Sequence, residues 1–546
     1  MQKEYIKPIF EKAIQSLDIE NYNLIFDVPK NLEFGDFSTN IAMQLAKPLK
    51  KSPREIAEII ISKLEFNNEL IEFVNIAGAG FINIKFSNNF YQDCLKSISK
   101  VENDFGKQTI GNGKKVNVEY VSANPTGLLH LGHGRNACTG DTVANLFEWL
   151  GYEVTREYYF NNAGNQMNNL GKSVFARYMQ IIDDENYPFP EDGYHGEYVK
   201  EIAQFLVSKY DKSLAEKNEE NLTICRKKAE EWCFDKILNT LGKMKIKQDI
   251  FYNEDSLYTE GKIARLIEDF KSMNLAYQKD GALWLKLTEL GLDDDRVIVK
   301  STGEPTYRLP DIAYHREKLL RGYDLVVDVF GADHIATVPD VLAGIKALGF
   351  DTEKVKILIH QFVTLTENGV QVKMSKRTGK SYTLDDLLDE VGADVVRFFL
   401  LMRGISTHLE FDLSLAREQS DKNPVFYLQY AHARISSIFD KIEDKKSYIN
   451  DEINYSLLNE KAEIDLIKRI IKFPEVIESA GIKCEPHHLT EYLRELAGDF
   501  HIFYHNCRIL GVEQNLQNSR LKLAEITKNI IKNGLTILGI SAPERM

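Results

Sequence analysis

Residues 118–141 read VEYVSANPTGLLHLGHGRNACTGD, and this stretch decides the predicted fold. An apolar strand opens it, and Val143, Leu146 and Leu150 continue at helical spacing just beyond. Strand, loop and helix in that order form a βα unit, and parallel sheets built from such units bind ligands beyond the carboxyl ends of their strands. The loop and the first helical turn are therefore expected to face a ligand.

Two further apolar runs, at 325–330 and 355–359, are bounded by polar loops and separated by a helical pattern. This arrangement is typical of a parallel sheet with crossover helices. Residues 80–86 alternate like a half-buried strand. The fold class predicted is α/β, with a Rossmann-like parallel sheet. We expect an N-terminal α+β module (1–108), a Rossmann-like domain (109–384) with a helical insertion (about 165–275) and an all-α region (385–546).

Length and composition narrow the class of protein. A chain of 546 residues is too long for a single core. The net charge of −13 argues against nucleic acid at first sight, yet residues 501–546 hold six Lys/Arg against three Asp/Glu, so an RNA-binding face is compatible with it. Six scattered cysteines without a C-x-x-C pair indicate buried thiols rather than a zinc ribbon or disulfides. With no apolar run of membrane length, we expect a cytoplasmic protein without a membrane partner.

Two histidines surround a glycine at the start of the predicted helix: His130, Gly132 and His133. The sequence Lys-Met-Ser-Lys lies 243 residues further on, at 373–376. Imidazole and ammonium donors at a helix N-terminus suit a polyphosphate that is losing pyrophosphate. The pattern predicts chemistry on ATP, with His130, His133, Lys373 and Lys376 as the catalytic groups.

Each of these features has a simpler explanation when taken alone. Histidines three residues apart are commonly surface residues or metal ligands, and a Lys-x-x-Lys loop is commonly just solvated charge. Their order along the chain, with Pro-Thr-Gly before the first histidine and a strand before each motif, favours the functional interpretation.

Longer strings carry a resemblance to a known family. The chain resembles the class I aminoacyl-tRNA synthetases, whose HIGH and KMSKS signatures look like the sequences at 130–133 and 373–377, and within that class the bacterial arginyl type. Leu131 stands for the isoleucine of HIGH, and Arg377 for the last serine of KMSKS, whose role here is left open. The strings that carry the resemblance are SANPTG (122–127), YYFNNAGNQ (158–166), GADH (331–334), NPVFYLQYAH (423–432) and APERM (542–546).

The resemblance implies an arginine–tRNA ligase that makes arginyl-adenylate from arginine and ATP and transfers arginine to tRNA(Arg), releasing AMP and pyrophosphate. It implies Mg²⁺ bound with ATP, no structural zinc or other metal site, and a protein that acts as a monomer. The ATP-binding residues that the resemblance implies are Gly132, Gly331, Asp333, His334, Met374 and Ser375. For Asp333, a role as the N-cap of a helix is an equally good interpretation.

A guanidinium has five N–H donors in a plane and is best met by carboxylates in fork geometry. Any one acidic residue is more often a surface carboxylate, so the assignment depends on the resemblance. The arginine-binding residues that it implies are Ser122, Asn124, Glu254, Tyr307 and Asp311, with Asn124 on the α-amino group.

For tRNA, the resemblance implies an anticodon-binding C-terminal bundle with Tyr427, Tyr430 and Met546, and an N-terminal contact to the D-loop through Phe81 and Asn83. Exposed aromatics stack well on unpaired bases, although aromatics on helices and strands are usually core residues. Two alternatives stay open: another class I synthetase, such as the cysteinyl type, and a catalytically silent RNA-binding relative. The missing Cys/His zinc set disfavours the first, and the intact catalytic set disfavours the second.

Overall fold

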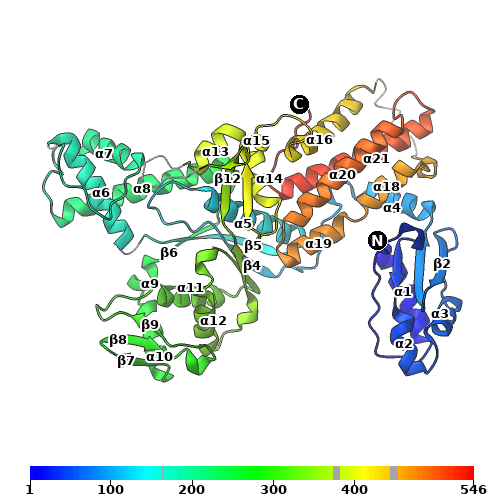
Figure 1. Ribbon diagram of the computed structural model, residues 1–546, viewed down its shortest axis with the longest axis horizontal. Coiled ribbons are helices and arrows are strands. Elements are labelled where there is room, and N and C mark those ends of the chain that lie inside the picture. The colour runs from blue at the N-terminus through cyan, green and yellow to red at the C-terminus, as the bar shows by residue number, and fades with distance from the viewer. Residues whose placement is uncertain (163–164, 184, 373–381, 443–452) are drawn as a thin grey trace.

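The computed structural model of this protein describes residues 1–162, 165–183, 185–372, 382–442 and 453–546, and Figure 1 shows how its elements are arranged. The N-terminal module contains an antiparallel sheet in the order β1-β3-β2, which packs with helices. Its elements are α1 (Gln2–Gln15), η1 (Leu32–Phe34), β1 (Phe37–Thr39), α2 (Ile41–Leu49), α3 (Pro53–Ser62), β2 (Ile71–Ala77), β3 (Phe81–Phe86), α4 (Asn88–Val101) and η2 (Glu102–Asp104).

A five-stranded parallel sheet in the order β11-β10-β4-β5-β6 forms the centre of the molecule. Val118 of β4 shares a buried cluster with Leu146 of α5, whereas Ile312 of α11 and Ile345 of α12 belong to a separate buried cluster. Helices therefore cover both faces of the sheet. The elements are β4 (Lys115–Glu119), α5 (Leu131–Trp149), β5 (Glu153–Phe160), β6 (Ile250–Asn253), α11 (Arg308–Leu320), β10 (Leu325–Gly331), η4 (Ala332–His334), α12 (Val338–Ala347), η5 (Thr352–Lys354) and β11 (Val355–His360).

The helical insertion forms a lobe of its own, seen at the left of Figure 1. It consists of α6 (Asn165–Ile182), α7 (Glu197–Tyr210) and α8 (Glu219–Lys243), which share a separate buried cluster. The lobe ends earlier than the expected boundary near residue 275, because β6 already pairs with β5 in the central sheet. Four residues give too short a pattern to identify that strand from the sequence.

Two small sheets were not expected from the sequence. One is antiparallel, in the order β7-β8-β9. The other has the order β13-β12-β14, in which β12 and β13 precede residue 372 and β14 follows α14. In the sequence, α9 and α10 lie between β6 of the central sheet and β7 of the antiparallel sheet. The elements are α9 (Asp255–Thr259), α10 (Lys262–Ser272), β7 (Ala276–Lys279), β8 (Ala282–Leu285), η3 (Thr288–Leu290), β9 (Arg296–Val299), β12 (Val363–Glu367), β13 (Val370–Gln371) and β14 (Leu409–Asp412).

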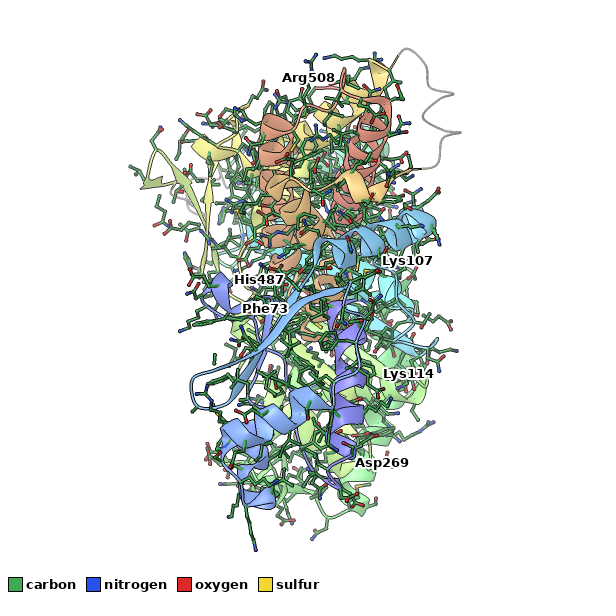
Figure 2. All side chains as sticks on the ribbon, turned by 90° about the vertical axis from the view of Figure 1, so that its right-hand side faces the viewer. Phe73, Lys107, Lys114, Asp269, His487 and Arg508 are labelled. Carbon is green, nitrogen blue, oxygen red and sulfur yellow. The ribbon has the colours of Figure 1, made fainter. Side chains whose placement is uncertain are left out.

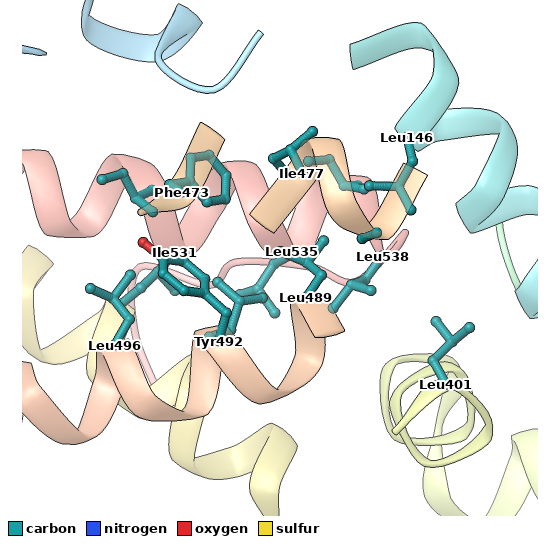
Figure 3. Close-up of a cluster of buried hydrophobic side chains, with 14 of the residues drawn as sticks. Leu146, Leu401, Phe473, Ile477, Leu489, Tyr492, Leu496, Ile531, Leu535 and Leu538 are labelled. Carbon is teal, nitrogen blue, oxygen red and sulfur yellow. The ribbon is translucent and has the colours of Figure 1, made fainter. Parts of the chain in front are cut away.

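The C-terminal region is a helical bundle, as expected, although the range 385–546 also contains the strand β14, so it is not all-α. Figure 3 shows its buried side chains Phe473, Tyr492 and Leu535 together with Leu146 of α5, so the bundle is packed directly on the central domain. The helices are α13 (Leu384–Val391), α14 (Ala393–Leu401), α15 (Leu413–Ala416), α16 (Pro424–Asp440), η6 (Tyr455–Leu457), α18 (Lys461–Ile470), α19 (Phe473–Lys483), α20 (His487–Asn506) and α21 (Gln514–Ile537).

The N-terminal module is attached to this bundle. Gln92 of α4 donates to the Leu458 carbonyl at 3.0 Å, and Lys468 of α18 lies 2.8 Å from Asp36. Figure 2 views the molecule from this end, with Lys107 in the linker that follows α4. The six cysteines are all buried and unpaired, which confirms the prediction of buried thiols. In the described part of the chain, no helix is long and apolar enough to cross a membrane.

Candidate active site

The loop after β4 has a strained backbone. Val121 and Ser122 adopt positive φ angles of 70° and 41°, a conformation that is costly for a β-branched residue. Asn136 of α5 holds the loop, because its side-chain oxygen accepts from the Val121 N–H at 2.6 Å while its amide donates to the Val329 carbonyl at 2.7 Å. One side chain thus ties the loop to α5 and to the neighbouring strand β10.

His130 and His133 cap the helix that the sequence predicted. The Nδ1 atom of His130 accepts from the N–H groups of Gly132 and His133, and the Nδ1 atom of His133 accepts from the His130 N–H at 3.3 Å. An accepting Nδ1 carries no proton, so each ring has its proton on Nε2. Burial, reinforced by His130 and His360, lowers the pKa of His133 to about 3. The pair therefore offers Nε2–H donors without positive charge.

Gly132 lies in close contact with this cap. A Cβ atom at that position would lie 3.0 Å from the Cε1 atom of His130, so a side chain would shift the ring by a few tenths of an ångström. Gly132 was predicted as an ATP-binding residue, and the structure gives it a place within the helix cap.

Lys373, Met374, Ser375 and Lys376 lie outside the described residues. The described chain that follows them returns directly to the histidines, since the Leu384 N–H donates to the Leu129 carbonyl at 2.8 Å. Residue 384 begins α13, and residue 129 immediately precedes His130. The first helix after the second signature sequence is therefore hydrogen-bonded to the residue before the first.

The Gly-Ala-Asp-His sequence lies at the carboxyl end of β10, as expected. His334 stacks on Phe330 with ring centroids 5.0 Å apart, and Asp333 is exposed with its carboxylate 3.8 Å from His334 Nε2. The alternative of a helix cap is wrong for Asp333, because α12 begins at Val338 with Thr337 at its N-cap. A Cβ at Gly331 would lie 2.5 Å from the Asp333 carboxylate, so a larger residue there would displace that exposed side chain.

Glu254 and Asp311 are neighbouring carboxylates in the region beyond the carboxyl ends of β4, β5 and β10, which we call the crevice. Glu254 is buried and accepts from the Tyr159 hydroxyl at 2.8 Å, and Asp311 lies in the first turn of α11. Burial raises the pKa of both carboxyl groups, and the charge of Asp311 raises that of Glu254 further. In the described part of the chain, neither forms an ion pair with Lys, Arg or His. Tyr307 lies one turn before Asp311 and is 74% exposed.

Ser122 and Asn124 occupy different surroundings. The Ser122 hydroxyl is engaged within the protein, where it donates to Glu119 at 2.8 Å and accepts from the Tyr159 N–H at 3.0 Å. Asn124 is exposed, and its amide donates to Gln166 of α6 at 2.8 Å. Of the two residues, Asn124 is therefore the one that is exposed and available to a ligand.

A row of three buried carboxylates crosses the sheet below this crevice and was missed from the sequence. In the strand register, Glu119 of β4 is opposite Asp328 of β10 on one side and Glu157 of β5 on the other. All three are almost fully buried. Like charges in adjacent positions destabilise a sheet, so cations have to neutralise the row.

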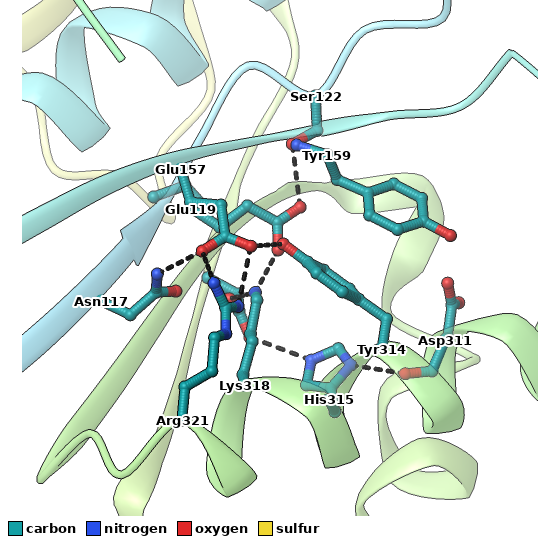
Figure 4. Close-up of polar contacts among 12 residues, drawn as sticks. Asn117, Glu119, Ser122, Glu157, Tyr159, Asp311, Tyr314, His315, Lys318 and Arg321 are labelled. Carbon is teal, nitrogen blue, oxygen red and sulfur yellow. Dashed lines mark hydrogen bonds and ion pairs between the residues drawn. The ribbon is translucent and has the colours of Figure 1, made fainter. Parts of the chain in front are cut away.

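Helix α11 and its C-cap residue Arg321 supply those cations, as Figure 4 shows. The Lys318 ammonium contacts Glu119 and lies 2.5 Å from Asp328, and Arg321 binds both Glu157 oxygens at 2.8 Å. Burial opposes the charge of Asp328, but Lys318 and a neighbouring histidine outweigh it and hold its pKa well below the usual range. A salt-bridge layer thus lies between α11 and the sheet.

The histidine in this layer connects it to Asp311. His315 Nε2 lies 3.0 Å from the Asp328 carboxylate, and Nδ1 lies 2.8 Å from the Asp311 carbonyl. Both partners are acceptors, so both ring nitrogens donate and the ring is protonated. Burial acts against this charge, but the bond to Asp328 prevails and raises the pKa of His315. With His315 counted, three cations balance the three carboxylates.

The residues expected to meet tRNA lie in the N-terminal module and in the C-terminal bundle rather than in the central sheet. Phe81 is 42% exposed at the start of β3, whereas Asn83, two residues on, is only 2% exposed and offers little surface to a partner. In the bundle, Tyr430 of α16 and the terminal Met546 are exposed, and the half-buried Tyr427 lies against His501, with ring centroids 4.8 Å apart.

Comparisons with known proteins agree along the whole chain. Three family models match: "Arginyl tRNA synthetase N terminal domain" over residues 4–86, "tRNA synthetases class I (R), catalytic domain" over 95–397, and "DALR anticodon binding domain" over 428–546. The arginine–tRNA ligase of Salinibacter ruber is 46% identical over 100% of both chains, and that of Desulfotalea psychrophila is 47% identical over 95% of this chain and 94% of its own.

The chain belongs to the arginyl-tRNA synthetases. This confirms the resemblance and excludes a different class I synthetase. Among solved structures, a putative arginyl-tRNA synthetase from Campylobacter jejuni is 33% identical with a TM-score of 0.78, covering 84% of this chain and 100% of its own. The Thermus thermophilus arginyl-tRNA synthetase has the same TM-score at 21% identity, covers 100% of both chains and supports the fold alone. The predicted fold class is confirmed.

Proposed function

We propose that the crevice at the carboxyl ends of β4, β5 and β10 makes arginyl-adenylate from arginine and ATP and then transfers arginine to the terminal adenosine of tRNA(Arg). The overall reaction, ligation of arginine to tRNA with consumption of ATP, follows from membership of the family. The observation that carries the assignment to this crevice is the pair Glu254 and Asp311. Their carboxylates lie above a charge-balanced layer and, within the described part, have no cationic partner.

Arginine fits this pair because its guanidinium brings the missing positive charge and donors for both carboxylates. Asn124 holds the α-amino group, Tyr307 closes over the guanidinium from the rim, and Ser122 supports the site by holding Glu119 and the Tyr159 N–H. A site built around buried acceptors rejects analogues that lack the donors, by factors that reach roughly 10⁴ to 10⁵. Citrulline and lysine are the analogues that this chemistry excludes.

For ATP, the neutral His130 and His133 donate Nε2–H to the phosphates, and the α5 N-terminus adds its backbone potential. Lys373 and Lys376 supply the positive charge that the two neutral histidines lack, with Met374 and Ser375 beside them. Gly132, Gly331, Asp333 and His334 complete the nucleotide site.

Mg²⁺ would enter with ATP, bound mainly by phosphates and water, as this cation prefers. The exposed Asp333 carboxylate is of the right chemical type to take part. The absence of a structural zinc stays a prediction. Among the described residues, Glu485, His487 and His488 bring ligand atoms within 4.8 Å of one another. They lie at the N-terminal end of α20, where the helix dipole disfavours a cation.

Two surfaces serve tRNA in this proposal. Tyr427, Tyr430 and Met546 meet the anticodon loop, and Phe81 meets the D-loop, with Asn83 supporting its strand from inside. The domain boundaries at residues 108 and 384, a monomeric state and a cytoplasmic location remain predictions.

Arginine-dependent ATP–pyrophosphate exchange, run with and without tRNA(Arg), tests the proposal. Exchange that requires arginine and not lysine or citrulline is the expected result. Exchange with another amino acid, or none with any amino acid in the presence of tRNA, would refute it. The second outcome is the one expected of a catalytically silent RNA-binding relative.

A further inference from the structure

The loop that carries Asn124 is held by side chains of the helical insertion. Tyr198 of α7 donates its hydroxyl proton to the Thr126 carbonyl at 2.6 Å. The Thr126 N–H donates in turn to the Asn124 carbonyl at 2.7 Å, and the Asn124 amide donates to Gln166 of α6 at 2.8 Å. Three successive hydrogen bonds therefore connect α7 to α6 by way of the loop.

Tyr198 is well placed to act as a fixed support. Its ring stacks on Trp232 of α8, with centroids 5.9 Å apart and planes inclined by 20°. The hydroxyl lies against Gly127, where an added Cβ would be 3.4 Å away. Burial raises the pKa of Tyr198 above its usual range, so the phenol keeps its proton and remains a donor at physiological pH.

The insertion and the sheet hold different parts of this loop. The Tyr158 hydroxyl of β5 donates to the Ala123 carbonyl at 2.7 Å, which fixes the residue just after the strained turn. Asn124 and Thr126, by contrast, are bonded to side chains of α6 and α7. Since the turn between Asn124 and Thr126 is closed by one backbone hydrogen bond, a shift of Thr126 displaces Asn124 with it.

We propose that Tyr198 is a positioning residue of the arginine site, which sets the place of Asn124 through the Thr126 carbonyl and so makes arginine recognition depend on the helical insertion. The inference rests on the role proposed above for Asn124, and it adds to that role a residue from a separate lobe of the molecule. Tyr198 itself does not touch the substrate.

The substitution Tyr198→Phe isolates this bond, because it removes the hydroxyl and keeps the ring on Trp232. In arginine-dependent exchange with tRNA(Arg) present, the arginine KM should rise about five- to tenfold, as expected for one lost hydrogen bond. The ATP KM should stay at the wild-type value. Gln166→Met removes the bond at the other end and should change the arginine KM in the same direction.

Tyr178→Phe is the matched control. Tyr178 is a buried tyrosine of α6 whose hydroxyl also donates to a backbone carbonyl, that of Asp211, but within the insertion. This variant should lower the melting temperature of the protein and leave both KM values unchanged. A purely structural role for Tyr198 predicts the same behaviour for both tyrosine variants.

An unchanged arginine KM in Tyr198→Phe overturns the inference, and so does an equal rise of the arginine and ATP KM values. A rise in Gln166→Met alone would place the support in α6 and also remove Tyr198 from the site. If the wild-type protein shows no arginine-dependent exchange, the proposed function fails and this inference fails with it. The wild-type measurement therefore distinguishes the two failures.

Discussion

At the scale of single residues, the proposed selection of arginine depends on Asp311. Its substitution Asp311→Asn keeps the shape but removes the charge and replaces one acceptor oxygen with a donor. A hydrogen bond to a charged group contributes roughly 1.5 to 3 kcal/mol, so the arginine KM should rise about 10- to 100-fold while the ATP KM stays constant. Exchange kinetics with arginine, citrulline and lysine measure this. Asp351→Asn, at an exposed carboxylate near β11, is the control, and wild-type selectivity in Asp311→Asn would exclude Asp311 from recognition.

The same carboxylates predict a pH dependence. Burial raises the pKa values of Asp311 and Glu254, so both protonate at a higher pH than free carboxyl groups do. As the pH falls through these raised pKa values, the negative charge that attracts the guanidinium is lost, whereas arginine itself stays charged. The arginine KM should therefore rise on acidification and level off at neutral pH. A KM that is constant from pH 8 to about pH 5 would show that these carboxyl groups do not have raised pKa values or do not bind the guanidinium.

Lys318 is the residue whose loss should be most damaging to stability. Lys318→Met leaves Glu119 and Asp328 buried beside each other without their shared cation, which costs roughly 3 to 5 kcal/mol. In the variant, the buried negative charges of Glu119 and Asp328 lower the free energy of unfolding, and the pKa values of both carboxyl groups rise. Protonation of these groups removes the charge and restores part of the lost stability. The deficit in unfolding free energy relative to wild type should therefore shrink as the pH falls toward those raised values.

Urea unfolding at pH 7.5 and about pH 5.5 measures the deficit of Lys318→Met. Lys271→Met, at an exposed position of α10, is the control and should change stability by less than about 0.5 kcal/mol. A deficit that is equal at both pH values would mean that the buried carboxylates are not its source.

At the scale of elements, the helices and strands that could be predicted from the sequence are those that are long enough to show a periodic pattern of apolar residues. The strands near 80–86, 325–330 and 355–359 were found because each has an apolar run or alternation of at least five residues. The cap at His130 was found through its motif. Strands of two to four residues, among them β6 and β13, contain too few positions to show a period.

The buried salt-bridge layer could not be predicted for a different reason. Its members come from β4, β5, β10 and α11, and only the strand register brings Glu119 beside Asp328. One local signal was present: Asp311, His315 and Lys318 follow one another at intervals of four and three, so they share one face of a helix. Polar residues on the face that packs against a sheet indicate a buried network, although their partners remain unknown without the fold.

Helix α13 follows the Lys-Met-Ser-Lys segment in the chain and its first residue bonds to Leu129 beside His130, so its cap should affect catalysis more than binding. Thr383 and Asp386 form a capping box, and the next residue, Leu384, bonds to Leu129. Thr383→Ala should weaken the start of α13 by about 1 kcal/mol. We expect a lower kcat of exchange with an unchanged arginine KM, and faster amide hydrogen exchange at the start of α13. Ser52→Ala, which removes the capping box of α3 in the N-terminal module, is the control for an equivalent cap remote from the crevice.

At the scale of the whole molecule, the N-terminal module, the central domain and the C-terminal bundle are packed together, although they are far apart in the sequence. The bundle rests on α5 through Leu146 and its neighbours, and the N-terminal module rests on the bundle through Gln92 and Lys468. A large RNA can therefore be held at both ends by one continuous body while its acceptor end reaches the crevice. Binding at the outer surfaces should then contribute to tRNA affinity and not to arginine recognition.

Phe81 and Tyr430 test this division. Loss of a base-stacking aromatic costs roughly 1 to 3 kcal/mol, so Phe81→Ala and Tyr430→Ala should each raise the tRNA KM in aminoacylation about 5- to 100-fold and leave the arginine KM unchanged. Because the two residues lie in different modules, their effects should add in free energy in the double variant. Phe34→Ala, at an exposed phenylalanine of the same N-terminal module, is the control for Phe81 and should leave the tRNA KM at its wild-type value. Equal effects of Phe34→Ala and Phe81→Ala would show that the module responds to any lost aromatic, and a raised arginine KM would show that these surfaces are not separate from the crevice.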